Sequence, residues 1–443
     1  MDDKNREQNN KIENSWQNGK EVNQEEASIG LDKKGGSNSK KLARHDRMKI
    51  WFYAAAGILL IAVIVVLIVV NFSDKEGGTD NTEISDSETV IIEESDELTS
   101  GSVTTTIGGK SITYKAAYVV DGVAATIKSG TYESTSDDEA VFLVINGGSL
   151  AIEGGVTINK TGSADFDGRG DDYSFYGINS AVVVVGEGSS VAIVDATINT
   201  SVDGANAIVA TNSGSAVVGN IVINTTADSS RGLHATYGGT IVGNDVKIST
   251  QGQSCAALAT DRGSGTVKVS GAELLTAGAG SPLIYSTGEI EVSSSTGVAT
   301  GAQIAVVEGK NSITLNDCDF SANGVGNRGS VDNAGVMIYQ SMSGDASVGT
   351  GSFMATDCTL TVLSDSSVYM KTPFFFVTNT EAEISLSTVT ANFYEGSYFL
   401  SAVGTDEWGK SGANGATVTI DASNLTATNT NLNVDEISSV KGL

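Results

Sequence analysis

The feature that most constrains this chain is a strand pattern that repeats from about residue 101 onward and recurs every 23 to 25 residues between 190 and 311. The segments SVAIVDATINT at 190 and SAVVGNIVINT at 215 each alternate apolar and polar residues, pass through a small or Asx residue, and alternate again. A fixed period in this range is typical of solenoids, and alternation with a period of two excludes helical repeats. With 52 Gly and 2 Pro in 443 residues, the composition also favours short strands and tight turns.

The repeat predicts an all-β fold, a parallel β-helix over residues 101–443 in which each strand pairs with its equivalent in the next coil. Alternation then decides which side chains face the interior. The predicted inward residues of two coils are Val191, Ile193, Ala196 and Ile198, and Ile313, Leu315, Cys318 and Phe320. The predicted corner residues, where Asx side chains tolerate the bend, are Asp195, Asn220, Asp245, Asp317 and Asp357. The last coil ends at SSVKGL without a recognisable polar cap, so we expect the C-terminal cap to be irregular or missing.

The chain has three cysteines, Cys255, Cys318 and Cys358, and no CxxC or Cys/His cluster, which argues against a zinc site. Cys318 and Cys358 fall in the same column of the repeat. We therefore expect two buried thiols that pack as small apolar groups. A disulfide between adjacent coils is the alternative.

An uncharged apolar run predicts one transmembrane helix over residues 49–72, because about 20 such residues span a bilayer core. Five Lys or Arg lie between residues 40 and 49, whereas acidic residues follow the run. The positive-inside rule then places residues 1–48 in the cytoplasm, as a disordered polar tail. Residues 73–100, with ten acidic residues and one lysine, are predicted to form an extended extracellular linker. The expected location is the cell membrane, in a single pass, with the C-terminal domain outside.

The net charge of −27 lies almost wholly beyond the N-terminal tail, because residues 1–49 carry eleven Lys or Arg against nine Asp or Glu. A polyanion would be repelled at long range, so nucleic acid is excluded as a partner. Cations, basic surfaces and neutral glycans remain as candidate partners.

The phrases NSITLNDCDF, GVMIYQSMSGDA and GSPLIYSTGEIEV, set in acidic coils rich in Gly, Thr and Val, resemble the right-handed parallel β-helix surface proteins of bacteria, which are often called adhesin-like. The resemblance covers residues 101–443. It implies a right-handed coil, a surface location and an adhesive or carbohydrate-binding role. Pectate-lyase-type enzymes share the fold, so the step from fold to function is an analogy.

One interval between coils, from 149 to 190, is about 16 residues longer than a standard coil and contains DFDGRGDD. Four carboxylates there are candidate calcium ligands, since Ca²⁺ takes six to eight oxygens. These candidates are Asp165, Asp167, Asp171 and Asp172. A plain solubilising loop is the alternative, and a third reading is the integrin-binding tripeptide that Arg169, Gly170 and Asp171 spell.

Aromatic residues gather toward the C-terminal end, where exposed rings would suit the stacking of sugars. The candidate carbohydrate-binding residues are Trp408, Tyr394, Tyr398 and Phe375. In PFFFV, alternation buries either Phe375 or its two neighbours, so at least one ring is expected to face outward. Ordinary closure of the core is the alternative.

Catalysis on a β-helix needs carboxylate pairs with His, Arg or Lys beside them. Residues 101–443 contain one histidine, His234, and no compact motif of that kind. Arg231 and Arg262 lie in equivalent parts of neighbouring coils, and we interpret them as solvated turn residues. The sequence therefore predicts an adhesin-like binding protein that is not an enzyme. A structural spacer and a polysaccharide-active enzyme are the alternatives, and carboxylates clustered with Arg231 or His234 would favour the enzyme.

Overall fold

The computed structural model describes residues 90–92, 98–324, 334–341, 344–363, 372–393, 398–404, 417–423, 426–427, 432–434 and 439–441. The chain divides into two units, Met1–Asp80 and Asn81–Leu443, and all described residues belong to the second. The predicted tail and transmembrane segment lie outside the described residues. Within the described ranges, no helix has the length and apolar character needed to cross a membrane.

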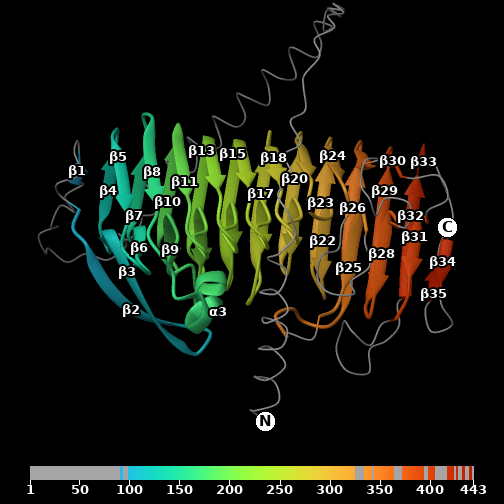
Figure 1. The fold of residues 1–443 in the computed structure, drawn as a ribbon, viewed down its shortest axis with the longest axis horizontal. Helices are drawn as coiled ribbons and strands as arrows, with labels where there is room; N and C mark the ends of the chain where they lie inside the picture. The colour runs from blue at the N-terminus through green and yellow to red at the C-terminus, as the bar shows by residue number, and fades with distance from the viewer. Residues whose placement is uncertain are drawn as a thin grey trace, which may run out of the picture. The chain divides into compact units, whose positions relative to one another are not determined.

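The described residues form two long sheets and one helix, α3 (Phe166–Tyr176), as Figure 1 shows. The larger sheet, called the large sheet below, contains β1 (Val90–Ile92), β4 (Ala124–Ile127), β5 (Thr131–Ser134), β7 (Ser149–Ile152), β8 (Val156–Lys160), β10 (Ser190–Val194), β11 (Ala196–Thr200), β13 (Ser215–Thr225), β15 (Gly239–Thr250), β17 (Gly265–Ser270), β18 (Glu273–Thr276), β20 (Glu289–Ser293), β21 (Thr296–Ala299), β23 (Ser312–Asn316), β24 (Asp319–Ala322), β26 (Thr350–Thr356), β27 (Thr359–Val362), β29 (Glu381–Ser387), β30 (Thr390–Asn392), β32 (Thr417–Ser423), β33 (Thr426–Ala427) and β35 (Ser439–Lys441).

The second sheet, called the small sheet, contains β2 (Gly101–Ile107), β3 (Lys110–Asp121), β6 (Ala140–Ile145), β9 (Val182–Val185), β12 (Ile208–Thr211), β14 (Leu233–Ala235), β16 (Leu258–Thr260), β19 (Ile284–Ser286), β22 (Ala305–Glu308), β25 (Val336–Tyr339), β28 (Phe375–Thr378), β31 (Leu400–Ala402) and β34 (Leu432–Val434). Apart from the antiparallel hairpin β2–β3, the described pairings are parallel.

The pairing register confirms the repeat that the sequence predicts. Ser190 pairs with Ser215, and Ser215 pairs with Thr240, so residues one period apart lie side by side. Each coil adds one or two strand segments to the large sheet and one strand to the small sheet. This all-β arrangement of long parallel sheets fits a parallel β-helix. The strand β1 lies inside the predicted linker and pairs with β4, so the sheet begins before residue 101.

The predicted interior and corners are also confirmed. Val191, Ile193, Ala196 and Ile198 are all buried in the main core between the two sheets. Five corner residues adopt the left-handed conformation, with φ between 50° and 57°. They are Asp195, Asn220, Asp245, Asp317 and Asp357, and Asx residues tolerate this conformation better than most others.

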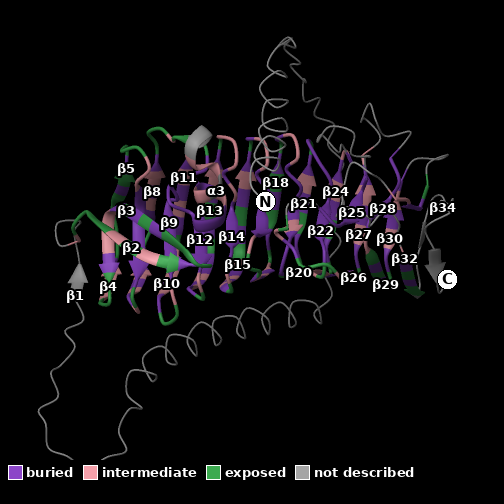
Figure 2. Ribbon diagram, turned by 90° about the horizontal axis from the view of Figure 1, so that it is seen from below, coloured by how far each residue is buried: buried purple, intermediate pink, exposed green. Residues whose placement is uncertain are grey.

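The outer face of the small sheet is covered at its N-terminal end by the hairpin β2–β3 and by α3. Tyr173 and Tyr176 of α3 are buried there with Val183 and Val209 of the sheet. Gly177 ends the helix with φ 69°, and a Cβ on this residue would lie 2.8 Å from Val209. In Figure 2 the strands of the small sheet are coloured as buried over most of their length. The long interval after β8 is therefore anchored to the coil by its aromatic side chains.

Candidate functional site

The acidic stretch that ends in α3 forms ion pairs with the protein itself. Asp172 accepts from Lys110 Nζ at 2.5 Å and from Arg169 Nε at 3.3 Å. Asp165 is exposed at the start of α3, and the side chains of Asp167 and Asp171 lie outside those described. Among the described side chains, no group of three or more Asp, Glu, His or Cys is placed to hold a metal ion. Calcium binding by this stretch stays a prediction.

The predicted aromatic cluster is only partly described. Phe375 is buried in the interior, where its ring packs against Phe353 and Phe399 at centroid distances of 5.6 and 5.5 Å. Phe374 and Phe376 are buried as well. Phe376 does face the outer side of the small sheet, but it is covered there. This burial removes Phe375 from the candidate sugar-binding surface.

Of the other three candidates, the structure describes only Tyr398, which is 42% exposed. Tyr394 and Trp408 lie outside the described residues. One exposed ring by itself does not make a binding surface.

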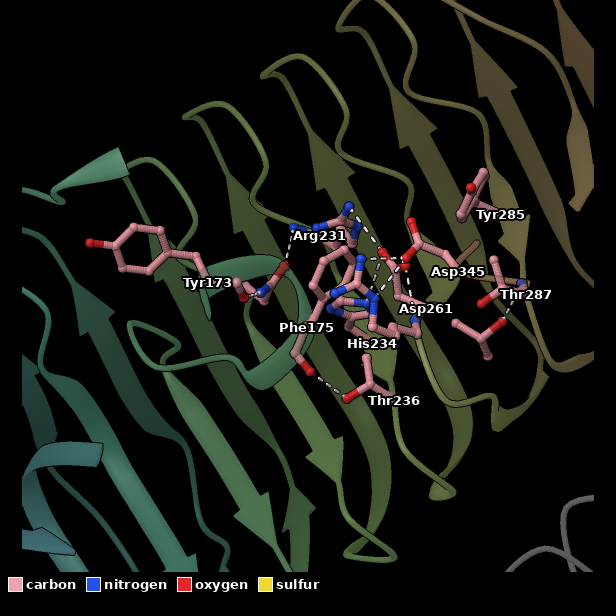
Figure 3. A network of polar contacts seen from close by, with 12 residues as sticks. Tyr173, Phe175, Arg231, His234, Thr236, Asp261, Tyr285, Thr287 and Asp345 are labelled. Atoms are coloured by element: carbon pink, nitrogen blue, oxygen red, sulfur yellow. Dashed lines mark hydrogen bonds and ion pairs between the residues drawn. The ribbon is translucent and has the colours of Figure 1, made fainter. Parts of the chain in front are cut away.

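The structure brings ionisable residues together at the middle of the outer face of the small sheet (Figure 3). His234 projects outward from β14, in register with Val209 of β12 on one side and Ala259 of β16 on the other. Arg231 precedes β14, and Asp261 follows β16. The parallel register therefore places one basic residue, one histidine and one carboxylate beside each other.

Two arginines contact Asp261 in this cluster. The Arg231 guanidinium lies 3.4 Å from Asp261 Oδ2, and the backbone N–H of Arg262 donates to Asp261 Oδ1 at 2.9 Å. The Arg262 side chain turns toward Asp345, with 2.6 Å between Nη2 and Oδ1. The same guanidinium lies 3.9 Å from the centre of the Phe175 ring of α3. The cluster thus joins α3, two coils and the segment around residue 345.

His234 is fully buried, and neither of its ring nitrogens has a hydrogen-bond partner among the described residues. Asp261 lies beside it, with 3.9 Å between His234 Nε2 and Asp261 Oδ2. Arg231 Nη1 is also buried and has no hydrogen-bond partner in that part of the chain. Burial, with a smaller contribution from Arg231, holds the pKa of His234 well below its ordinary value, so the imidazole is neutral.

Burial raises the pKa of Asp261 to about 7. The positive charge of Arg231 opposes this shift, whereas the nearby carboxylates Asp345 and Glu308 add to it. Near neutral pH the Asp261 carboxyl can therefore either donate or accept a hydrogen bond.

Glu308 lies next to the cluster but is already occupied by hydroxyl donors. Its carboxylate accepts from Tyr285 Oη at 2.5 Å and from Tyr339 Oη at 3.0 Å, and also from Ser341 Oγ. The side chain is buried. The oxygens of Glu308 are therefore already used, and its negative charge acts on the cluster by helping to raise the pKa of Asp261. Arg231, His234 and Asp261 keep unused hydrogen-bonding capacity.

The sequence places Arg231, Arg262 and His234 in the right coils, but the interpretation of Arg231 as a solvated residue is wrong. Arg231, interpreted as a solvated turn residue, is 12% exposed and ion-paired. One signal was available, because the small-sheet strands read as continuous apolar runs such as VVVV, which indicates burial on both faces. The contact between Arg262 and Asp345 spans 83 residues and follows no repeat.

Comparison with known proteins does not change this description, because no protein-family model and no curated protein matches the chain.

Proposed function

We propose that the protein is an adhesin-like surface protein that binds carbohydrate through Arg231, His234 and Asp261 on the outer face of its small sheet. The observation that carries this proposal is the set of buried nitrogens on Arg231 and His234 that lack partners among the described residues, beside the Asp261 carboxyl. A buried polar group without a partner is costly, so such a set is suited to a ligand that supplies the missing hydrogen bonds.

The chemistry of the three side chains matches sugar hydroxyls. A hydroxyl accepts from Arg231 and donates to Asp261 or to the bare nitrogen of a neutral His234. Cationic ligands fit less well, since two arginines already lie at the site. Arg262 is 37% exposed, so the cluster meets solvent at that edge, where a sugar would enter. Display outside the cell by the predicted membrane segment 49–72 is part of the same proposal.

A glycan array probed with the full chain in mild detergent tests the proposal. We expect binding to a subset of neutral glycans, and at least tenfold weaker binding for Asp261→Asn and for Arg231→Lys, since each hydrogen bond to a charged group contributes about 1.5 to 3 kcal/mol. Lys268→Gln is the matched control, because Lys268 pairs with Glu291 on the large sheet, away from the site. A blank array for the wild type would instead favour a structural spacer.

A second candidate function, cleavage of a polysaccharide, is favoured by the raised pKa of Asp261 beside other carboxylates. A carboxylic acid that keeps its proton near pH 7 can protonate a leaving group, while a second carboxylate assists. Release of new reducing ends from a glycan that the wild type binds, and its loss in Asp261→Asn, would favour this function over binding alone.

A further inference from the structure

Two cysteines lie next to each other at the same corner of adjacent coils. Cys318 separates β23 from β24, and Cys358 separates β26 from β27. The residues that follow them, Asp319 and Thr359, are paired in register, and Thr359 N donates to Cys318 O at 2.8 Å. Neighbouring strands lie about 4.8 Å apart, which is inside the range of Cα separations that a disulfide spans.

Both thiols turn inward at this corner and are free in the structure. Cys318 Sγ donates to Asn316 O at 3.4 Å, and Cys358 Sγ donates to Thr356 O at 3.1 Å. In the preceding coil the same position is Ser295, whose Oγ donates to Ser293 O at 2.7 Å. A serine therefore occupies this corner naturally, so cysteine-to-serine variants at the two positions are expected to fold.

Cys318 borders a depression in the surface of the protein. A depression of about 320 Å³ opens over this corner, and Cys318, Asp317, Asp357 and Thr359 are among the residues that line it. The interaction with Cys318 lowers the pKa of the Cys358 thiol. The same interaction, together with burial, raises the pKa of Cys318, so Cys358 is the thiol of the pair that ionises more readily. Burial raises the pKa of Cys255 to about 12, which keeps this third thiol protonated.

We propose that Cys318 and Cys358 are a disulfide-forming pair that locks two adjacent coils together. The oxidant is a small disulfide such as oxidised glutathione. One cysteine thiolate attacks a sulfur of the oxidant and expels the first glutathione thiol; the other cysteine then attacks this mixed disulfide and expels the second. The two protein thiols lose two protons and two electrons, and the oxidant is reduced to two thiols.

The bond would act on the candidate site through the chain between the two cysteines. Residues 319–357 include Tyr339 and Ser341, which donate to Glu308, and Asp345, which pairs with Arg262. A covalent loop over this segment lowers the entropy of its unfolded states. The folded segment, with these contacts, is therefore more stable relative to the unfolded one. The inference does not depend on carbohydrate binding, because it needs only the geometry of the corner.

The experiment uses the full chain, equilibrated in an oxidising glutathione buffer and then unfolded with an alkylating reagent. Trypsin separates the three cysteines into peptides 248–262, 311–328 and 329–371. We expect the second and third peptides to be disulfide-linked and the first to be alkylated, with the intact protein two hydrogen atoms lighter. The link should persist in Cys255→Ser and be absent from Cys318→Ser and Cys358→Ser.

The temperature of the unfolding midpoint shows whether the disulfide stabilises the fold. Reduction should lower the unfolding midpoint of the wild type by about 5 °C and leave that of Cys318→Ser unchanged. Three alkylated cysteines in the oxidised wild type, or a link that involves peptide 248–262, would overturn the proposal. An unchanged midpoint in spite of the link would overturn the locking role.

Discussion

The outer faces of the two sheets differ although the same coils build both. On the large sheet, outward residues are half-buried or exposed, as the alternating burial of β10 and β11 shows. On the small sheet, every residue of β9, β12 and β14 is buried. The difference arises because the hairpin β2–β3 and α3 pack on the small sheet, where their aromatic side chains join a second core. The outer face of the large sheet is thus solvated, whereas the outer face of the small sheet is buried. Burial there shifts the pKa values of ionisable groups such as His234 and Asp261.

The largest expected effect comes from placing the same charge on each face. Val209 points outward from β12 and is fully buried, whereas Val222 points outward from β13 and is 38% exposed. We expect Val209→Asp to lower the free energy of unfolding by about 5 kcal/mol, because it buries an unpaired carboxylate. Val222→Asp should cost less than about 1 kcal/mol. Chemical denaturation of both variants measures the contrast, and equal losses would show that the small sheet is not covered in solution.

A smaller effect should appear in the pH dependence of stability. The pKa of Asp261 is about 7 in the folded protein, against about 3.9 for an unfolded aspartate. Between these values the folded state keeps a proton that the unfolded state has released. The stabilisation is therefore complete below about pH 4 and is lost as the pH rises through 7, by up to about 4 kcal/mol.

Asp261→Asn removes this titration, so its stability relative to the wild type should rise from pH 5 to pH 8. The measurement is the difference between the two proteins, because neutral His234 contributes a slope of opposite sign that both share. The contrast with the solvated face is Glu291→Gln on the large sheet. The hydrogen bond from Lys268 lowers the pKa of Glu291, so this carboxylate stays ionised from pH 5 to pH 8 and the stability of the variant relative to the wild type should stay flat. A flat difference for Asp261→Asn as well would contradict the buried, proton-holding carboxyl.

The smallest expected effect compares one ion pair from each face. Arg262 pairs with Asp345 at 2.6 Å and packs on Phe175, whereas Lys247 pairs with Glu273 at 3.2 Å with both side chains more than half exposed. Arg262→Ala should cost about 2 kcal/mol, and Lys247→Ala less than about 0.5 kcal/mol. Thermal midpoints at low and high salt would measure both, and a larger salt effect for the Lys247 pair is expected.

The sequence predicts most of the coil but little of the candidate site. Asp195 and its equivalents were placed at the corner because Asx residues recur there, and the structure confirms the left-handed conformation at each. Alternation in PFFFV predicts that at least one ring faces outward, and Phe376 does so, but it is covered because both faces of β28 are buried. DFDGRGDD reads as a long interval between coils, and the sequence does not show that Tyr173 and Tyr176, just beyond it, pack on the sheet as part of α3.

The sequence by itself determined the parallel coil, its interior and its corners, since each depends on residues that are close in the chain and repeat at one period. Only the tertiary structure decided which outer face is covered and which side chains meet there. Arg231, Asp261 and Asp345 come from different coils and from an irregular segment, and no periodic pattern relates their positions. The pKa values of Asp261 and His234 follow from that covering, because burial is the largest cause of both shifts.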